Sequence, residues 1–429
     1  MSAEKKRIVK RSKTNSVMEL VASRLGVTPQ ELEREVSGKC KNVLNIAGLD
    51  KAVDLFWSMI DSPVYVYCDY DCDGITSGSI ISIGCNSIGI KPHIIIPRRF
   101  TDGYGIKVKN LENMDPSGLL ITVDNGIAAN EAVDTAKEKG MKVIILDHHE
   151  ARILNGEQFL PEADVVIDPH ITEADFEDYC GAGLAYRFMR EVFAKKRRPA
   201  DLNGIMSSMI ALAAVGTVGD SVTMKAENRF LVRRGMEQIE QKRVSTGLVL
   251  LLEEMKLSDT LSVEDIAYSL VPAINAFGRL EDEGSRKVAA LLSYTGRKSD
   301  GAKNAAQIVK QMNDERKTYC KELTELAEKM VEETGQMNNS VLVLQDDRFL
   351  KGICGIIAGN LTEKYKVPSI VFGAPENGIC VGSGRSRDWC NLKAAMDKCS
   401  GLFFQYGGHP AACGASIQIE NIDTLRQTM

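Results

Sequence analysis

The chain has 429 residues, of which 44% are hydrophobic and 26% charged. This composition predicts a globular protein of two or three domains, and it excludes collagen, a simple coiled coil and disorder throughout. The formal net charge of −5, taken alone, argues against a nucleic-acid partner, because a polyanion favours a basic protein.

The first fifteen residues are polar and basic and are expected to be mobile, and residues 16–60 are predicted to be mainly helical. Val17, Leu20, Val21 and Leu25 follow helical spacing, and Thr28 before Pro29 is typical of a helix start. The basic run at 5–13 is not followed by the apolar stretch of a signal peptide. No run in the chain approaches the roughly 20 apolar residues of a membrane span, so we expect no membrane partner.

Four short apolar runs follow, and each ends at an aspartate. They are residues 64–68 before Asp69, 119–123 before Asp124, 143–146 before Asp147 and 165–167 before Asp168. Uninterrupted apolar runs suit strands that are buried on both faces, and helical stretches are predicted between them at 77–88 and 128–139. This alternation predicts a parallel sheet whose ligands bind at the carboxyl ends of its strands.

The rest of the chain is predicted to be helical and then α/β again. Residues 180–240 are predicted to be helical, and the apolar segment 211–216 leads to Asp220. Residues 303–333 form the clearest amphipathic helix, which suits a connector between two lobes. Strands are then expected at 341–344 and 369–372, with an amphipathic helix over 392–403. The predicted fold class is α/β, with an N-terminal parallel sheet and a smaller C-terminal α/β domain joined by a long helix.

The eleven cysteines give no sign of a disulfide framework or a zinc site. Their number is odd and no CxxC pair occurs, so we expect free thiols in a reducing cytoplasm.

The sequence DYDCDG places three carboxylates, Asp69, Asp71 and Asp73, within five residues. In an extended backbone, alternate side chains share a face, so we expect these three to point together. Clustered anions repel one another unless a cation neutralises them, and oxygen ligands suit Mg²⁺ or Mn²⁺. An EF-hand is excluded because its twelfth position, counted from Asp69, holds Ile80 in place of glutamate.

Asp147-His148-His149 adds imidazole groups to these carboxylates. Adjacent histidines on a turn point in different directions, so we expect one to bind the same metal as Asp73 and the other to face the substrate. Mixed carboxylate and imidazole ligands favour Mn²⁺. The Asp124 carboxylate can bridge two ions, and a pair of metals about 3.5–4 Å apart is the usual arrangement for attack on a phosphodiester.

Two glycine-rich segments near the C-terminus predict a phosphate-binding lobe. Residues 382–386 (GSGRS) and 407–409 (GGH) have the composition of small-residue loops, each with one cationic or hydrogen-bonding side chain. Glycine lets backbone N–H groups approach an anion, and arginine binds phosphate through two parallel hydrogen bonds.

These motifs together resemble the DHH/DHHA1 phosphoesterase superfamily. The resemblance rests on DYDCDG, VDNGI, LDHHE and GGHPAACGAS. Finer matches resemble the RecJ branch of this superfamily, the single-strand-specific 5′ exonucleases. The matching segments run from Arg98-Arg99 through DGYGI at 102–106, and continue at 180–188, 215–220, 227–235, 274–280 and 382–386. The matches run in family order from about residue 50 to the end, whereas the first 50 residues match poorly.

The resemblance implies a role for each site residue. One ion would be held by Asp69, Asp71 and Asp124, and the other by Asp73, Asp124, His148 and Asp220. The family pattern assigns the last place to Asp220, which leaves Asp168 and His170 as turn residues. Asp147 would orient His148, and His149 would contact the scissile phosphate. The implied substrate-binding residues are Arg279, Ser383, Arg385, Ser386, Gly408 and His409, with Tyr104 lining the cleft.

The implied function is hydrolysis of single-stranded DNA from its 5′ end in DNA repair and recombination. Two divalent ions, Mn²⁺ or Mg²⁺, would serve the cleavage, and 5′-mononucleotides would be released. A single-strand-binding protein is the one further partner considered. The expected domains are an N-terminal helical segment (1–48), the DHH catalytic domain (49–240), a helical connector (241–334) and the DHHA1 substrate-binding domain (335–429).

Two alternatives stay open. The first is a phosphodiesterase of the same superfamily that acts on short oligonucleotides or cyclic dinucleotides, which the absence of an oligonucleotide-binding barrel favours. The second is a replication scaffold that has lost its activity, which the complete ligand set disfavours. The related pyrophosphatases have a different first motif.

The charge balance does not exclude a nucleic acid once the metal site is considered. Two divalent ions would bring the net charge from −5 to about −1, and basic residues are locally concentrated at 5–13, 98–99, 195–198 and 385–387. The local field decides phosphate binding, not the total charge.

Overall fold

The computed structural model describes residues 16–36, 44–154, 156–196, 198–257 and 261–429. The basic run at 5–13 and Cys40 lie outside these residues. The chain divides into two compact units. The first comprises Met1–Tyr67, Thr76–Ile94 and Lys107–Val244, and the second comprises Cys68–Ile75, Ile95–Ile106 and Ser245–Met429.

A five-stranded sheet forms the core of the first unit, in the order β2-β1-β3-β4-β7. Strand β4 pairs in parallel with both β3 and β7. All five residues of β3 are buried, as expected for a strand that is covered on both faces. The strands are β1 (Val64–Cys68), β2 (His93–Ile95), β3 (Leu119–Val123), β4 (Lys142–Leu146) and β7 (Val165–Ile167). The four predicted strands are therefore confirmed.

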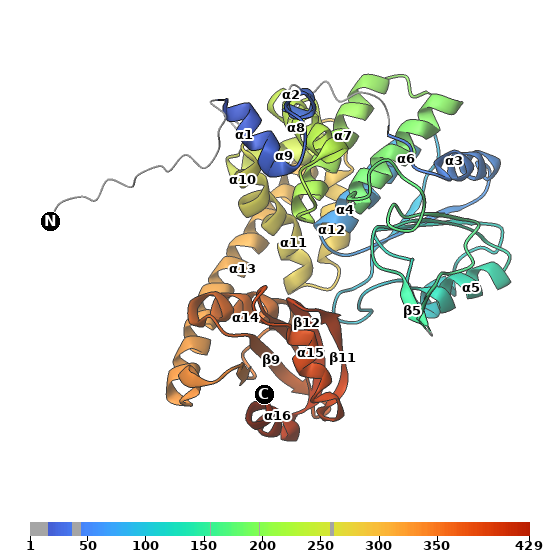
Figure 1. The fold of residues 1–429 in the computed structure, drawn as a ribbon. Coiled ribbons are helices and arrows are strands. Elements are labelled where there is room, and N and C mark those ends of the chain that lie inside the picture. The colour runs from blue at the N-terminus through green and yellow to red at the C-terminus, as the bar shows by residue number, and fades with distance from the viewer. Residues whose placement is uncertain (1–15, 37–43, 155, 197, 258–260) are drawn as a thin grey trace. The chain divides into compact units, whose positions relative to one another are not determined.

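Helices cover both faces of this sheet (Figure 1). Helix α6 packs on α3, β3 and β4, and α5 packs on β4. The helices of this unit are α1 (Val17–Leu25), α2 (Pro29–Val36), α3 (Leu49–Ser58), α4 (Cys72–Ser87), α5 (Asn130–Glu138), α6 (Gly181–Lys195), α7 (Leu202–Gly219) and α8 (Ala226–Glu240), with a 3₁₀ turn η1 (Val108–Leu111). The hairpin of β5 (Arg152–Leu154) and β6 (Glu157–Phe159) was not predicted, because its exposed strands have only three residues each.

Helix α7 is the one described helix that is long and apolar enough to cross a membrane. Most of it, 61% of the window, is buried inside the protein. It therefore has the properties of a core helix.

The second unit begins with helices. They are α9 (Thr246–Met255), α10 (Val263–Asp265), the π-helical turn η2 (Ile266–Leu270), α11 (Val271–Leu280), α12 (Gly284–Leu292) and α13 (Asp300–Glu333), followed by the 3₁₀ turn η3 (Gln336–Asn338). Helix α13 confirms the predicted long helix, and it packs on α9, α11 and α14.

A second five-stranded sheet follows, in the order β11-β12-β10-β9-β8. Strands β8 and β9 are parallel, and the other neighbours are antiparallel. On β8, Leu342 and Leu344 pack against α13 and α14, whereas Val343 packs in the opposite core with α15 and α16. The elements are β8 (Leu342–Gln345), α14 (Lys351–Tyr365), β9 (Ser369–Glu376), β10 (Ile379–Arg385), α15 (Leu392–Asp397), η4 (Ser400–Leu402), β11 (Phe403–His409), β12 (Ala412–Gln418), η5 (Ile419–Asn421) and α16 (Ile422–Thr428).

Two predictions for this region were wrong. The glycine-rich segments at 382–386 and 407–409 are not loops but lie largely in β10 and β11. The helix predicted over 392–403 ends at Asp397, and Phe403 begins β11. Apolar spacing alone could not separate a short helix from a strand that follows it closely. The prediction of free thiols is confirmed for the ten described cysteines.

Candidate metal centre and phosphate-binding face

Four aspartates follow strands of the parallel sheet at one edge. Asp69, Asp124, Asp147 and Asp168 come directly after β1, β3, β4 and β7. Each is at most 4% exposed. Because the carboxyl ends of parallel strands meet at the same edge, the sheet itself brings these side chains together.

The segment after β1 is a tight turn into α4. Asp71 accepts hydrogen bonds from the backbone N–H groups of Asp73 (3.0 Å) and Gly74 (3.2 Å), so it caps the helix. A Cβ atom on Gly74 would lie 2.3 Å from the Asp69 carbonyl oxygen, so only glycine fits. The prediction of an extended backbone here was wrong, because Asp73 lies in the first turn of α4.

Asp124 has an unusual backbone conformation. Its φ is +61°, in the left-handed region, and its N–H donates to the Leu146 carbonyl at 3.0 Å. The next residue, Asn125, donates its side-chain amide to the Val123 carbonyl at 2.9 Å and to the Tyr67 carbonyl at 3.3 Å. Strained backbone of this kind persists where the surroundings determine it, and it is common at functional sites.

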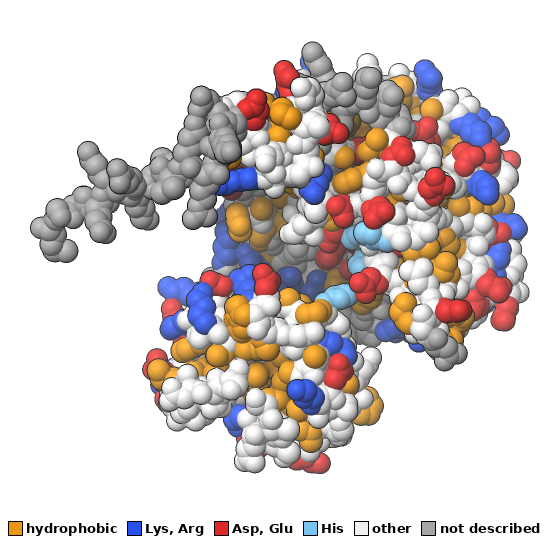
Figure 2. All heavy atoms as spheres, viewed as in Figure 1, with side chains coloured by type: hydrophobic (Ala, Val, Ile, Leu, Met, Phe, Trp, Pro, Cys, Tyr) orange, Lys and Arg blue, Asp and Glu red, His pale blue; other side chains and the backbone are white. Residues whose placement is uncertain are grey.

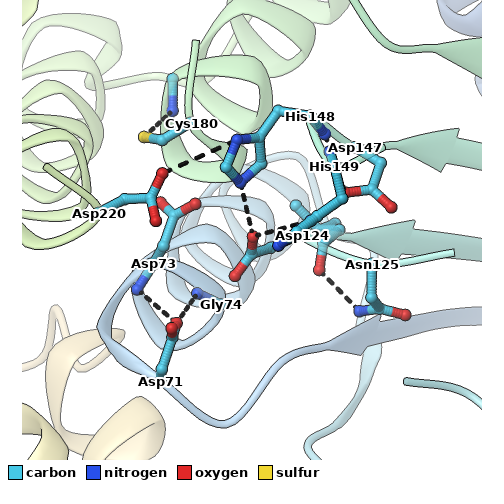
Figure 3. A network of polar contacts seen from close by, with 12 residues as sticks. Asp71, Asp73, Gly74, Asp124, Asn125, Asp147, His148, His149, Cys180 and Asp220 are labelled. Carbon is cyan, nitrogen blue, oxygen red and sulfur yellow. Dashed lines mark hydrogen bonds and ion pairs between the residues drawn. The ribbon is translucent and has the colours of Figure 1, made fainter. Parts of the chain in front are cut away.

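The His148 ring lies between two carboxylates (Figure 3). Its Nε2 is 3.1 Å from Asp124 Oδ1, and its Nδ1 is 3.7 Å from Asp220 Oδ2. A neutral imidazole carries a proton on only one ring nitrogen, so the other nitrogen would face an anion. A cation held among these groups removes that conflict.

Two further sets of ligand atoms gather around Asp124 and His148. Those of Asp73, His148 and Asp220 lie within 4.8 Å of one another, and so do those of Asp69, Asp71 and Asp124. In Figure 2, acidic side chains lie beside the histidines visible on that face. Burial, and then Asp73, raise the pKa of Asp71. Oxygen donors with one imidazole suit Mn²⁺ or Mg²⁺, so the residues fit divalent ions.

Asp147 holds the ring of His149. Its Oδ1 lies 2.7 Å from His149 Nδ1, and its carboxylate also accepts from the backbone N–H groups of His148 and Ile127. Although burial opposes it, the hydrogen bond from His149 and the further bonds lower the pKa of Asp147. The contact that Asp147 makes with His148 here is to its backbone N–H, at 2.8 Å, so the role of Asp147 in orienting the His148 ring stays a prediction.

Asp168 does not belong to the grouped ligands. Its Oδ1 accepts from the His170 backbone N–H at 3.0 Å, and its backbone oxygen accepts from Ile171 and Thr172. It is therefore a turn residue, as the family pattern implied. Its Oδ2 is buried without a hydrogen-bond partner among the described residues. Burial raises the pKa of Asp168 to about 7.

The antiparallel part of the second sheet brings small residues together with an arginine and a histidine. Arg385 on β10 and His409 on β11 both pair with Ala412 of β12, so they lie level on one face. Ser383 and Gly407 both pair with Gly414 one step along the same face. Added Cβ atoms at Gly407 and Gly414 would meet nothing within 4 Å, so the sheet is open above them. Gly408 has φ +128°, which glycine adopts without strain.

Ser386 and Tyr104 differ in their exposure. Ser386 is 6% exposed, and its hydroxyl donates to the Cys390 carbonyl at 2.8 Å, which stabilises the turn after β10. Tyr104 is 47% exposed on the segment after β2, so its ring is accessible.

Arg279 belongs to a cluster of arginines within the second unit. Burial, and then the charges of Arg99, Arg385 and Arg316, lower its pKa, and its Nη1 donates to the Gly352 carbonyl at 3.1 Å. Nε of Arg99 and of Arg316 is buried without a hydrogen-bond partner among the described residues. Sequence reasoning left Arg99 unassigned and missed Arg316, because a helix pattern does not show which lysines and arginines point inward. An anion is the ligand that this cluster fits.

Comparison with known families covers both sheets. Residues 63–217 match the DHH family, N-terminal domain, and residues 338–429 match the DHHA1 domain.

Curated relatives extend the match over most of the chain. The single-stranded-DNA-specific exonuclease RecJ of Bacillus subtilis is 31% identical over 89% of this chain and 47% of its own length. RecJ of Dickeya dadantii is 30% identical over 93% of this chain and 71% of its own length. The chain thus spans about half of the first relative and somewhat over two thirds of the second.

Solved structures of RecJ proteins have a fold similar to that of this chain. A crystal structure of exonuclease RecJ bound to manganese has a TM-score of 0.76 at 25% identity, and covers 90% of this chain and 94% of its own. RecJ from Thermus thermophilus in complex with Mn²⁺ has a TM-score of 0.75 at 24% identity, with 96% of this chain and 60% of that chain covered, and supports the fold.

Proposed function

The chain belongs to the RecJ family of single-stranded-DNA-specific exonucleases, and we propose that it hydrolyses single-stranded DNA from the 5′ end and releases 5′-mononucleotides. The observation that carries this proposal is the gathering of five carboxylates and one imidazole at the edge of the parallel sheet. Carboxylate oxygens with one imidazole nitrogen are ligands that suit divalent ions such as Mn²⁺ or Mg²⁺.

We propose Asp69, Asp71 and Asp124 as ligands of one ion, and Asp73, Asp124, His148 and Asp220 as ligands of the other. Mn²⁺ or Mg²⁺ fits both sets. When bound, such ions polarise the phosphodiester and lower the pKa of a coordinated water.

His149 and Arg279 act on the phosphate in this proposal. Asp147 accepts a hydrogen bond from Nδ1–H of His149, which orients the ring so that His149 would contact the scissile phosphate. Arg279 supplies positive charge from a partly buried position, where water screens it less than at an open surface.

Residues 335–429 are the proposed substrate-binding domain, and 49–240 the catalytic domain. Ser383, Arg385 and His409 share one face of the sheet, which is open above Gly407 and Gly414, and Gly408 allows the β11 backbone to bend beside them. A DNA backbone lying on this face would meet Arg385 and His409 as donors. Ser386 supports the turn that follows Arg385, and Tyr104 offers a ring for stacking on a base.

The decisive experiment is a digest of single-stranded DNA that is labelled separately at each end, with Mn²⁺ present. We expect loss of the 5′ label first and mononucleotide products. Loss of the 3′ label first would refute the polarity. Hydrolysis confined to dinucleotides or cyclic dinucleotides would instead support the superfamily's small-substrate alternative.

We further propose a cytoplasmic location and a role in DNA repair and recombination. The free state of the ten described cysteines supports a reducing compartment. A single-strand-binding protein is the proposed additional partner, and addition of one to the digest would test it through a change in the rate.

A further inference from the structure

We propose that Asp282 is a positioning residue that holds the Arg99 loop ready for the substrate phosphate; this inference rests on the proposed function. Asp282 lies in the short link between α11 and α12. Its Oδ1 accepts the Phe100 backbone N–H at 2.8 Å, and its Oδ2 accepts the Thr101 hydroxyl at 2.5 Å. These residues are 181 or more positions from Asp282 in sequence, so the two bonds fix a long-range contact.

The bonded loop carries Arg99. It is closed on itself by the Arg98–Asp102 ion pair at 3.0 Å and by the hydrogen bond from Gly103 N–H to the Arg98 carbonyl. The Arg99 guanidinium carbon lies 4.2 Å from the centre of the Tyr70 ring. Its buried Nε has no hydrogen-bond partner among the described residues. The side chain is thus held by stacking while a donor remains for a ligand.

The same helix pair also contacts the metal-binding turn. Ser285, in the first turn of α12, donates its hydroxyl to the Tyr70 carbonyl at 2.8 Å and is 2% exposed. Arg279 lies in the last turn of α11. The α11–α12 pair therefore carries Arg279, holds the backbone before Asp71 through Ser285 and holds the backbone after Arg99 through Asp282.

A physical reason for the Asp282 bonds is the repulsion between the two cations. Arg99 lowers the pKa of Arg279, which means that the two guanidinium groups disfavour each other in the absence of an anion. Without the Asp282 bonds, the loop that carries Arg99 would move away from Arg279. The substrate would then have to bring the loop back into place when it binds. Preorganisation removes that cost from binding.

The first test compares Asp282→Ala with Asp282→Asn in steady-state hydrolysis of 5′-phosphorylated single-stranded DNA. Loss of both bonds raises KM by about tenfold, and kcat at saturation stays within about twofold. Asparagine restores KM to the wild-type value, because Oδ1 still accepts from Phe100 and Nδ2 can donate to the Thr101 oxygen. Thr101→Val, which removes one bond and leaves the link intact, raises KM by about threefold. The control is Asp300→Ala, whose side chain is fully exposed.

The second test does not depend on nuclease activity. Hydrogen exchange of the Phe100 amide, measured without DNA or metal, becomes faster in Asp282→Ala and returns to the wild-type rate in Asp282→Asn. An unchanged exchange rate, an unchanged KM, a fall in kcat alone, or failure of asparagine to restore KM would each overturn the inference. A wild-type protein without nuclease activity would refute the proposed function, and the exchange measurement would still test the Asp282 contact.

Discussion

Asp124 is the residue on which most of the proposed metal centre depends. It belongs to the Asp69–Asp71 group, and its Oδ1 is also 3.1 Å from His148 Nε2. Its φ of +61° also means that a substitution changes the backbone strain as well as the charge. Asparagine tolerates this conformation better than alanine does.

We expect Asp124→Asn and Asp124→Ala both to lower nuclease activity by more than about 100-fold, because a shared ligand is lost. Asparagine should keep the melting temperature, whereas alanine should lower it through backbone strain. The measurements are mononucleotide release with Mn²⁺ and thermal unfolding without metal. Activity retained in either variant would refute the ligand assignment, and Asp300→Ala serves as the control for loss of a carboxylate.

The raised pKa of Asp168 predicts that the stability of the folded protein depends on pH. Its pKa is about 7 in the folded protein against 3.8 unfolded, because burial disfavours the charged form. The folded state therefore binds the proton more tightly, and this contribution is complete below pH 3.8 and is lost as the pH rises through about 7. Asp168→Asn removes the ionising group, so it should raise the melting temperature more at about pH 8 than at about pH 5.

Asp164→Asn is the matched control for this pH dependence. Asp164 bonds Lys137 and Lys142, and although burial opposes it, these bonds lower its pKa. It is charged at both pH values, so its replacement should lower the melting temperature about equally at the two. An equal change for Asp168→Asn at the two pH values would contradict the raised pKa.

At the scale of elements, the contact between α14 and the second sheet decides where Arg385 lies. A Cβ atom on Gly355, within α14, would lie 2.6 Å from Arg385 Nη2 and 3.4 Å from Ser383 Cβ. The helix thus packs directly on the proposed phosphate-binding side chains. The sequence analysis predicted no helix between 344 and 369, and only the packing shows what Gly355 approaches.

We expect Gly355→Ala to separate stability from substrate affinity. Alanine favours a helix interior over glycine by up to about 1 kcal/mol, so the melting temperature should hold or rise. The added methyl group displaces the Arg385 guanidinium, so KM for single-stranded DNA should rise severalfold. Gly301→Ala on α13, which meets no atom within 4 Å, should leave KM unchanged. Equal KM values for both variants would contradict the role of this contact.

At the scale of the whole molecule, the acidic net charge and the proposed metal centre are linked. Part of the net charge of −5 belongs to grouped carboxylates whose mutual repulsion a bound metal ion would relieve. Their repulsion disfavours the folded state until ions bind, since the carboxylates separate on unfolding.

Metal removal should therefore destabilise the protein. An ion that binds only the folded state stabilises it by about 2.7 kcal/mol at a concentration of about 100 Kd. We expect Mn²⁺ to raise the melting temperature, EDTA to reverse the rise, and Asp124→Asn to reduce it. An equal rise in melting temperature in the wild type and in Asp124→Asn would show that the ion binds elsewhere. If neither Mn²⁺ nor Mg²⁺ raised the melting temperature of the wild type, the proposed metal centre would be refuted.

The sequence by itself determined the β-α alternation, the four strands that end at aspartates and the long helix, and it predicted the candidate site residues. Each of these depends on local periodicity or on a short motif, so neighbouring residues contain the information. The tertiary structure alone decided that Asp73 enters a helix turn, that the Asp147 carboxylate contacts the His149 ring, and that GSGRS and GGH lie largely in two strands on either side of β12. It also placed Arg99 and Arg316 near Arg279 and Asp282 against Phe100. These contacts join residues far apart in the chain, and no local pattern specifies which distant side chains will meet.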